Sequence, residues 1–424
     1  MEFKELSFEQ TQIRIIDGDR GKNYPKKSDL RQRGHTLFLN NKNIINNYLD
    51  DSFGEYISEE KSNLLRKGKL ERGDLVISTR GSIGNVGYYS SDIRTENIRI
   101  NSGMLIIRNF DNSIDTEYLY VLMRSNFMKQ RYKERISGSV QNQLPIRDFK
   151  KIKIPIPDLH SQIIIKNVIL TLDSKIEINN KIISNLESQA QAIFKSWFVD
   201  FEPFQDGNFV ESELGMIPEG WEVKKVNEIC DLKIGRTPPR KESEWFSLKE
   251  GVKWVSIKDL GLSQMYISEV TEYLTEESIE KFNIPIVEEN TLLLSFKLTV
   301  GRIAITTEKM CTNEAIAQFK DPLISTLFLF YYFKNFKFET LGNTSSIGNA
   351  VNSKIIKNIE VLVPPEKIVL KVMKMIEPLS ICIRKLLNQN TKLAELRDAL
   401  LPKLMAGEID VSNIKIEGEE VKNE

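Results

Sequence analysis

The chain has 424 residues, of which 41% are hydrophobic and 28% charged, as is typical of folded globular proteins. Its 59 Lys and Arg residues equal its 59 Asp and Glu residues, so no net charge draws the whole protein to nucleic acid or membrane. The longest apolar run, 322–333, is shorter than the ~20 residues that cross a bilayer. Three distant cysteines and two histidines give neither a disulfide framework nor a zinc-ligand spacing, so we expect no metal site.

The first residues, MEFKELSFEQ, lack the apolar core and cleavage site of a signal peptide, and we expect a cytoplasmic protein of two or three domains. The second half of the chain then resembles the first, in the same order and at offsets between 207 and 217. Four pairs of segments carry this resemblance: 24–28 with 238–242, 38–42 with 254–258, 75–78 with 292–295, and 152–157 with 359–364. Four pairs in one order indicate a tandem duplication, and each copy is long enough to be a domain with its own core.

Each copy changes its pattern once along the chain. Residues 1–157 and 205–364 carry short apolar runs between Gly, Asn and Pro signals, which predicts mixed helices and strands. After each of these regions the apolar residues follow heptad spacing, which predicts two long helices. The predicted seams are Ile165, Ile169, Leu172, Ile176, Asn179, Ile183, Leu186, Ala190, Ile193 and Trp197, and then Val372, Ile376, Leu379, Ile383, Leu386, Asn390, Leu393, Arg397, Leu400 and Leu404.

Two such seams in one chain most simply pack against each other as an antiparallel pair. Pro378 lies inside the second seam and predicts a kink or a later start of that helix. The predicted fold is therefore mixed α+β, with two pseudo-symmetric globular domains separated by two long antiparallel coiled-coil helices. The predicted segments are 1–157, 158–204, 205–364, 365–410 and an acidic tail, 411–424.

Motifs for catalysis are scarce. The sequence has no phosphate-binding loop of the G-x-x-x-x-G-K-[ST] type, no dinucleotide fingerprint, and no Asn/Asp-Pro-Pro-aromatic tetrapeptide of an amino-methyltransferase. One formal nuclease pattern exists, in which Asp158, Asp173 and Lys175 could hold Mg²⁺. The simpler interpretation is that Asp173 and Lys175 are solvated neighbours of a packing face.

Local charge is more informative than total charge. Between Arg20 and Lys42 there are seven basic residues and one acidic residue, Asp29, and the matching segment 233–258 is also basic but contains three Glu. Both segments are rich in Gly, Pro, Asn and Ser, which predicts exposed loops that could contact phosphates and base edges. An ordinary solvated loop is the alternative, but recurrence in both copies favours nucleic-acid binding.

Two further loops recur, 79–84 with 296–301, and 137–143 with 345–350. They combine small residues with Arg and Lys, which suit guanine or phosphate, and with Asn and Gln, which suit adenine, although ordinary turns have similar compositions. The predicted DNA contacts are Arg20, Lys22, Lys26, Lys27, Arg31, Arg33, Lys42, Arg80, Ser82, Gln141, Asn142, Arg236, Arg240, Lys241, Lys258, Lys297, Thr299, Arg302 and Asn349.

Three blocks of sequence resemble the DNA-specificity (S) subunit of type I restriction-modification systems. They are LDSKIEINNKIISNLESQAQAIFKSWFVDFEPF (172–204) followed by GMIPEGW (215–221), KLAELRDALLPKLMAGEIDV (392–411), and the pair of openings DGDRGKNYPKKSD (17–29) and GRTPPRKESEWF (235–246). Together with the duplication, the resemblance covers nearly the whole chain.

The resemblance implies two target-recognition domains, each reading one half of a bipartite sequence in double-stranded DNA. It implies that the helices dock two methyltransferase subunits, which flip an adenine for methylation, and that motor-nuclease subunits join them. S-adenosylmethionine, ATP and Mg²⁺ would then be bound by the partners, and this chain would bind no cofactor and catalyse nothing. On this reading the candidates for subunit docking or helix packing are Phe194, Trp197, Phe198, Phe201, Leu400, Leu401 and Leu404.

Two residues depart from what the repeat and the family resemblance lead one to expect. Leu298 stands where the first copy has Gly81, and Asp410 stands where a basic residue is common in the family. The contacts of the second domain and of the terminal docking surface are therefore less constrained. The alternatives are a duplicated coiled-coil scaffold that binds only proteins, and an autonomous Mg²⁺-dependent nuclease.

Overall fold

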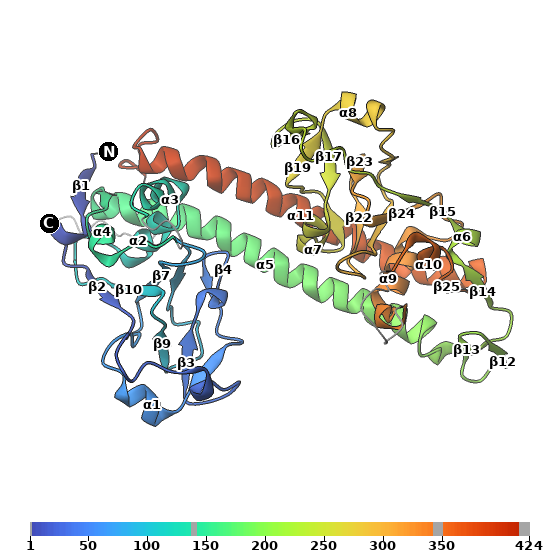
Figure 1. Ribbon diagram of the computed structural model, residues 1–424, viewed down its shortest axis with the longest axis horizontal. Helices are drawn as coiled ribbons and strands as arrows, with labels where there is room; N and C mark the ends of the chain where they lie inside the picture. The colour runs from blue at the N-terminus through green and yellow to red at the C-terminus, as the bar shows by residue number, and fades with distance from the viewer. Residues whose placement is uncertain (1, 137–141, 342–350, 415–424) are drawn as a thin grey trace. The chain divides into compact units, whose positions relative to one another are not determined.

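The computed structural model describes residues 2–136, 142–341 and 351–414, which form two compact units (Figure 1). Unit 1 comprises residues 1–177 and 390–424, and unit 2 comprises residues 178–389. Two 40-residue helices, α5 (Leu159–Phe198) and α11 (Glu366–Met405), each contribute one segment to each unit. The remaining elements of each unit form a globular head.

The head of unit 1 is built on two small sheets. Its elements are β1 (Lys4–Ser7), β2 (Arg14–Asp17), β3 (Thr36–Leu39), β4 (Ile44–Ile45), β5 (Tyr48–Leu49), β6 (Glu55–Ile57), α1 (Glu59–Leu64), β7 (Leu75–Ser78), β8 (Val86–Tyr88), β9 (Ile98–Ile100), β10 (Met104–Arg108), α2 (Thr116–Met123), α3 (Asn126–Lys133), α4 (Ile146–Lys150) and β11 (Lys153–Ile156). One sheet has the order β2-β10-β7-β8 and the other β6-β3-β9, while β1 pairs with β11 and β4 with β5. The central strands β7 and β3 are buried along their whole length, as their continuous apolar sequences require.

The head of unit 2 repeats this plan. Its elements are β12 (Phe209–Ser212), β13 (Gly215–Pro218), β14 (Glu222–Lys225), α6 (Val226–Ile229), β15 (Asp231–Ile234), β16 (Phe246–Ser247), β17 (Val252–Val255), α7 (Ile257–Leu262), β18 (Tyr266–Ile267), β19 (Glu272–Leu274), α8 (Glu276–Lys281), β20 (Ile286–Val287), β21 (Leu292–Ser295), β22 (Ile303–Thr306), β23 (Met310–Thr312), β24 (Ile316–Lys320), α9 (Thr326–Asn335), α10 (Ser353–Lys357) and β25 (Glu360–Val363). Its sheets have the orders β15-β24-β21-β22-β18 and β16-β19-β17-β23-β20, β14 pairs with β25, and β12 with β13.

The strand pairing confirms that the two heads are copies of one fold. The order β2-β10-β7-β8 corresponds to β15-β24-β21-β22, and β6-β3-β9 corresponds to β19-β17-β23. Even the parallel pair is repeated, because β3 runs parallel to β9 and β17 runs parallel to β23. The mixed fold class and the duplication predicted from the sequence are both confirmed.

Within each unit, the segments of α5 and α11 pack side by side and run antiparallel. In unit 1, Asp173 bonds to Arg397 at 2.9 Å, and His160 lies 2.9 Å from the carbonyl oxygen of Ile414. In unit 2, the amide nitrogen of Asn179 donates to Gln389 Oε1 at 2.9 Å, and Lys371 lies over the ring of Trp197. In both units the residue numbers rise along α5 while those of the contacted residues fall along α11 and, for Ile414, along the segment that follows it, so the predicted antiparallel pairing is confirmed.

Pro378 does not delay the start of the second long helix. The alternative of a later start is wrong, because α11 begins at Glu366 and passes through Pro378 without a break. Proline removes one backbone hydrogen bond, but Val372 and Ile376 before it and Ile383 after it are fully buried on one face. Burial of this face holds the helix together, while the hydroxyl of Ser380 donates to the carbonyl of Glu377 beside the proline.

Candidate nucleic-acid interface

In unit 1, a serine at the end of β7 fixes the conformation of the loop that follows. The hydroxyl of Ser78 donates to the carbonyl of Ser82 and accepts from the backbone N–H of Asn85 at 3.2 Å. The backbone N–H of Gly84 donates to the carbonyl of Ser78 at 2.9 Å. The loop 79–84 is therefore closed at its base, and its outer residues are presented to solvent.

Unit 2 contains the same set of bonds at the end of β21. The hydroxyl of Ser295 donates to the carbonyl of Thr299 at 2.6 Å and accepts from the backbone N–H of Arg302 at 3.0 Å. The backbone N–H of Gly301 donates to the carbonyl of Ser295 at 3.0 Å. The predicted recurrence of this loop is therefore confirmed at the level of its hydrogen bonds, which close loop 296–301 in the same way as loop 79–84.

A left-handed glycine against an aromatic ring closes both loops. Gly84 has φ +89° and Gly301 has φ +92°, a backbone region that favours glycine. A β-carbon at Gly84 would lie 2.9 Å from the ring of Tyr132, and one at Gly301 would lie 2.7 Å from the ring of Phe338. The ring can pack against the backbone only because no β-carbon intervenes.

A second glycine in each unit brings the basic segment to the same place. A β-carbon at Gly18 would lie 2.3 Å from the carbonyl oxygen of Asn101, and one at Gly235 would lie 2.1 Å from that of Thr312. The loop behind each contact also meets the serine-closed loop, since the backbone N–H of Thr79 donates to the carbonyl of Gly103 at 2.8 Å. In each head, the start of the basic segment and the serine-closed loop therefore meet the same loop, 101–103 in unit 1 and 312–315 in unit 2.

In unit 1, two of the predicted contacts, Arg20 and Arg80, lie near Ser102 and Gly103. Arg20 donates to the carbonyl of Ser102 at 3.3 Å and pairs with Asp17. Arg80 donates to Gln143 Oε1 at 3.0 Å, which connects the loop after β7 with the segment before α4. Arg20 and Arg80 therefore have partners within the protein, and they position neighbouring groups as well as presenting charge.

Two acidic residues of this region, Asp19 and Asp29, accept hydrogen bonds from backbone N–H groups. Asp19 accepts from the N–H groups of Gly21 and Arg66, and these hydrogen bonds hold its pKa below the ordinary value. Asp29 accepts from the N–H of Lys26 and pairs with Lys61 at 3.0 Å, and these bonds likewise lower its pKa. Both carboxylates therefore stay ionised as structural anchors.

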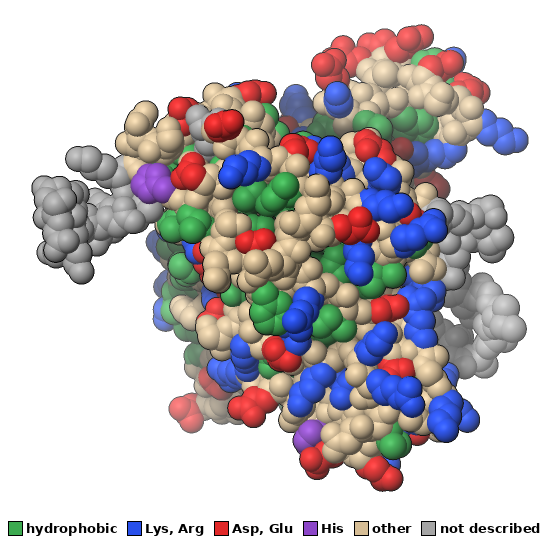
Figure 2. Space-filling model, turned by 90° about the vertical axis from the view of Figure 1, so that its left-hand side faces the viewer, with side chains coloured by type: hydrophobic (Ala, Val, Ile, Leu, Met, Phe, Trp, Pro, Cys, Tyr) green, Lys and Arg blue, Asp and Glu red, His purple; other side chains and the backbone are tan. Residues whose placement is uncertain are grey.

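The remaining basic side chains of unit 1 are on its surface. On the face shown in Figure 2, Lys and Arg side chains are numerous over the part that carries α1 and β3, with a few Asp and Glu between them. The exposed predicted residues are Lys22, Lys26, Lys27, Arg31, Arg33 and Lys42. A phosphate backbone is the kind of ligand that such exposed cations suit.

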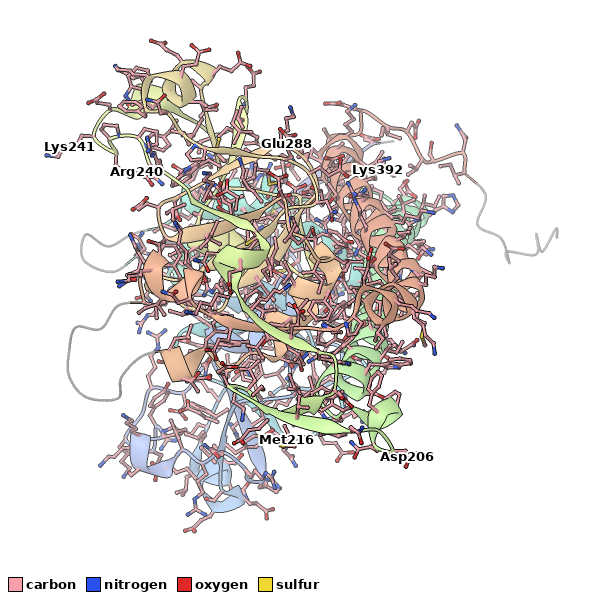
Figure 3. All side chains as sticks on the ribbon, turned by 90° about the vertical axis from the view of Figure 1, so that its right-hand side faces the viewer. Asp206, Met216, Arg240, Lys241, Glu288 and Lys392 are labelled. Carbon is pink, nitrogen blue, oxygen red and sulfur yellow. The ribbon has the colours of Figure 1, made fainter. Side chains whose placement is uncertain are left out.

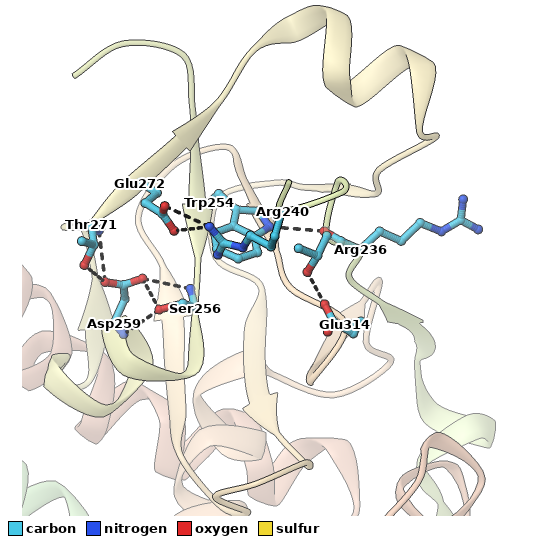
Figure 4. A network of polar contacts seen from close by, with 9 residues as sticks. Arg236, Arg240, Trp254, Ser256, Asp259, Thr271, Glu272 and Glu314 are labelled. Atoms are coloured by element: carbon cyan, nitrogen blue, oxygen red, sulfur yellow. Dashed lines mark hydrogen bonds and ion pairs between the residues drawn. The ribbon is translucent and has the colours of Figure 1, made fainter. Parts of the chain in front are cut away.

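In unit 2, the predicted arginines Arg236 and Arg240 differ in whether their charge is paired within the protein. The guanidinium of Arg240 pairs with both carboxylate oxygens of Glu272 at 2.9 Å and lies 4.4 Å from the ring centroid of Trp254 (Figure 4). Arg236 extends away from this cluster and donates to the carbonyl of Phe282 at 3.2 Å. Arg240 therefore stabilises the start of the basic segment of unit 2, and its charge is already balanced by Glu272.

The predicted lysines of unit 2, Lys241, Lys258 and Lys297, are all exposed. Figure 3 shows Lys241 at the edge of the unit, with its side chain projecting outward. Arg302 is half-buried and donates to the carbonyl of Ile257 at 2.7 Å, so it fixes α7 to the loop.

Sequence reasoning found the loops but missed the groups that shape them. It did not identify Ser78, Ser295, Gln143 or the close approach of Gly18, although the shared endings LVIS and LLLS of two matching strands carried the signal for the serines. Ser82, Asn142 and Thr299 are exposed, as the proposed contacts require. The predicted contacts Gln141 and Asn349 lie outside the described residues.

The sequence matches the family model of the type I restriction modification DNA specificity domain twice, over residues 8–188 and 218–396. The chain belongs to this family. It is a DNA-recognising specificity subunit, and such subunits are non-catalytic.

Curated relatives resemble this specificity subunit over most of their length. It is 27% identical over 380 residues to the type I restriction enzyme MjaIX specificity subunit of Methanocaldococcus jannaschii, covering 85% of this chain and 84% of the relative. It is 25% identical over 466 residues to the HindI specificity subunit of Haemophilus influenzae, covering 92% and 98%. A crystal structure of a type I S subunit from M. genitalium shares the fold, with a TM-score of 0.56 at 15% identity and coverage of 95% and 96%.

The aromatic residues near the end of α5 in the specificity subunit pack within unit 2. The ring of Phe194 packs at a tilt against Phe198, at 4.9 Å, and against Phe328 of α9, at 5.3 Å between ring centroids. Phe201 and Trp197 make edge contacts with neighbouring rings, at 5.4 and 5.8 Å. Of the two predicted roles, these contacts support helix packing.

The leucines near the end of α11 pack within unit 1. Leu401 and Leu404 are buried in its core, and Leu400 packs against the same core. Met405 follows them and meets the buried hydroxyl of Tyr118 at 3.7 Å. These leucines, too, serve internal packing.

The carboxylates of the formal nuclease pattern have structural partners. Asp158 caps the start of α5 by accepting from the backbone N–H of Ser161 at 2.9 Å. Asp173 is buried and pairs with Arg124 and Arg397. Burial alone would lower the pKa of Arg124, but the nearby Tyr120 and Asp173 outweigh it and raise that pKa, so the arginine stays charged.

Within 2–136, 142–341 and 351–414, no group of three His, Cys, Asp or Glu side chains is arranged to hold a metal ion. No helix in this part of the chain is both long and apolar enough to cross a membrane.

Proposed function

We propose that this specificity subunit reads a bipartite target in double-stranded DNA, one half-site with each head, and that it carries methyltransferase and motor-nuclease subunits. The observation behind the proposal is the repeated serine-closed loop. The same bonds at Ser78 and Ser295 present loops 79–84 and 296–301 beside a basic segment in both heads. Two equivalent reading edges in one chain suit two half-sites.

The cations divide into two groups on this proposal. The exposed lysines and arginines contact phosphates, which contributes affinity without sequence information. The residues at the loop tips and at the ends of strands contact base edges, where hydrogen bonds and apolar contacts distinguish the bases. Arg240 and Arg302 mainly hold the loops in place, because both are engaged within the protein.

The docking of partner subunits is assigned to the outer faces of α5 and α11. Several large apolar side chains there are exposed: Ile178, Ile182, Leu370, Met375 and Ile381 in unit 2, and Leu396 in unit 1. Exposed apolar residues on a long helix fit helices of a protein partner. S-adenosylmethionine, ATP and Mg²⁺ are assigned to those partners, and a cytoplasmic location stays a prediction.

The decisive experiment co-expresses the chain with its methyltransferase partner and maps methylated adenines in the host DNA. The proposal expects one motif made of two short specified parts with an unspecified spacer. Exchange of residues 1–157 for those of another specificity subunit should change one part and leave the other. Modification at a single continuous motif, or none, would contradict bipartite reading.

Salt dependence tests the phosphate contacts. Replacing Lys26, Lys27, Arg31 and Arg33 by Ala should lower affinity and reduce the slope of log affinity against log salt by about 3 to 4, since each phosphate contact contributes about 0.9. The matched control replaces four exposed lysines outside the segment: Lys133, Lys150, Lys151 and Lys153. An unchanged slope in the first variant would favour a scaffold that binds only proteins.

A further inference from the structure

Leu298 has a conformation and an exposure that are unusual in combination. Its side chain is 96% exposed, and its backbone has φ +61°, in the left-handed region. The N–H of Thr299 donates to the carbonyl of Lys297 at 2.7 Å, which places Leu298 at the centre of a tight turn of the rare, strained kind. Apart from Asn and Asp, Phe201 is the other described non-glycine residue with positive φ, and it packs against Trp221.

Exposure alone would not distinguish this leucine. Leu323 and Leu248 are 81% and 76% exposed, and isolated surface leucines are normal. Leu298 differs because Ser295 closes its loop from below and because its left-handed backbone is strained. A side chain retained at the tip of a rigid loop, in a conformation that glycine would adopt more easily, is explained by contact with a ligand.

The neighbours of Leu298 indicate the chemistry of that ligand. Lys297 and Thr299 are exposed on either side of it, so a cation and a hydroxyl flank one apolar group. In the major groove of DNA, the 5-methyl group of thymine is the apolar feature among hydrogen-bonding base edges, and phosphates lie on both sides. The loop therefore matches a thymine edge with its neighbouring polar groups.

We propose that Leu298 is a specificity-determining residue of unit 2 that contacts the 5-methyl group of a thymine in the major groove. This inference rests on the proposed function, because it names the base that one of the two reading loops recognises. The equivalent position of unit 1 is Gly81, with φ +66°, so loop 79–84 lacks this apolar contact. The two heads consequently read their half-sites with different chemistry at equivalent positions.

The test uses the full chain in complex with its methyltransferase partner, after the methylated motif has been mapped. Duplexes carry the motif with one thymine at a time replaced by uracil, which removes only the methyl group, and affinity is measured by fluorescence anisotropy. We expect one uracil substitution to weaken binding about fourfold, the effect of one buried methyl group. The Leu298→Gly variant should bind the thymine and uracil duplexes with equal affinity.

The control variant is Leu323→Ala, which removes another highly exposed leucine of unit 2 and should keep the preference for thymine. Glycine suits the backbone at position 298, so the variant should fold. The inference is overturned if no uracil weakens binding, if the preference survives in Leu298→Gly, or if that variant loses affinity for all duplexes alike, as removal of an unstacking wedge would cause. A wild-type complex with no sequence-specific DNA binding would instead refute the proposed function itself.

Discussion

The two heads are fixed to the long helices by different interactions. In unit 1, Arg124 at the end of α2 meets Asp173 of α5, which also binds Arg397 of α11. In unit 2, aromatic rings make a large part of the contact between head and helix, with Phe194 and Phe198 of α5 against Phe328 of α9. A buried ion pair at the Asp173 position is thus a feature of unit 1, because the equivalent residue of unit 2 is Ser380, whereas an aromatic cluster is a feature of unit 2.

The ion pairs and the aromatic contacts constrain the position of the head on the helices in different ways. Ion pairs are directional, and the carboxylate of Asp173, 5% exposed, must lie between two guanidinium groups, which fixes the rotation of α2 relative to both helices. Aromatic packing depends on buried area and tolerates more sliding. The ion pairs of Asp173 should therefore fail more abruptly when one member is removed.

The largest expected effect follows from Asp173→Ala in unit 1. It leaves the buried Arg124 and the half-buried Arg397 without their shared anion, and loss of one partner of a buried pair costs about 3–5 kcal/mol. Urea unfolding followed by circular dichroism should show this loss. All four tryptophans, 197, 221, 245 and 254, lie in unit 2, so their fluorescence reports on the other head.

The matched control is Ser380→Ala in unit 2. Ser380 is the residue equivalent to Asp173 in the second copy of the repeat, at an offset of 207. Ser380 is buried, and its hydroxyl donates to the carbonyl of Glu377, a neutral bond whose loss costs about 1 kcal/mol. Equal losses of unfolding free energy in Asp173→Ala and Ser380→Ala would show that the ion pairs of Asp173 stabilise the protein no more than a neutral hydrogen bond does.

The glycines at the base of the loops should give the next largest effect and should again distinguish the units. Gly84→Ala forces a β-carbon against the fully buried Tyr132, so we expect a loss of about 2–3 kcal/mol. Gly301→Ala meets Phe338, which is half-buried and can yield, so a loss of about 1 kcal/mol is expected. Thermal unfolding of both variants measures the order, and the reverse order would contradict the assignment.

The aromatic cluster of unit 2 should lose less stability under a moderate change. Phe198→Leu keeps an apolar side chain but removes the ring contacts with Phe328 and Trp221, at 5.0 and 5.9 Å, for an expected loss of about 1–2 kcal/mol. Tryptophan fluorescence should detect it directly, since Trp221 is a contact. High salt should leave this loss unchanged, whereas a salt-dependent loss would indicate an electrostatic origin.

The sequence predicted the architecture because periodicity and repetition are local properties of the chain. The heptad seams predicted the antiparallel pairing of α5 and α11 in each unit, and the matched strand sequences predicted two equivalent heads. The expectation that Pro378 could delay the start of the second long helix was wrong. The backbone hydrogen bond that proline removes is evident from the sequence, whereas the burial of Val372, Ile376 and Ile383, which stabilises the helix, is not.

The candidate site was predictable in position but not in detail. The charges between Arg20 and Lys42 located an exposed basic segment, yet composition could not show that Arg240 is paired with Glu272 or that Arg80 meets Gln143. Such pairs join residues 32 and 63 positions apart, so only the folded chain brings them together. Asp173 was expected to be a solvated neighbour of a packing face, and this was wrong, because it is buried between Arg124 and Arg397, two partners that only tertiary structure brings to it.

The smallest effect concerns the loop tips themselves, where Gly81 and Leu298 occupy equivalent left-handed positions. Leu298→Gly should raise the free energy of unfolding by about 0.5–1 kcal/mol, because glycine adopts φ +61° without strain. Gly81→Leu should lower it by about 1 kcal/mol, since an L-residue is disfavoured at φ +66° and its β-carbon would lie 2.8 Å from the amide nitrogen of Asn41. Thermal unfolding measures both changes. A stabilising Leu298→Gly together with a destabilising Gly81→Leu would show that leucine at position 298 lowers the stability of unit 2, as expected of a side chain kept for contact with DNA. If Leu298→Gly were destabilising, the side chain would have a packing role within the protein, and the strain could not be attributed to recognition.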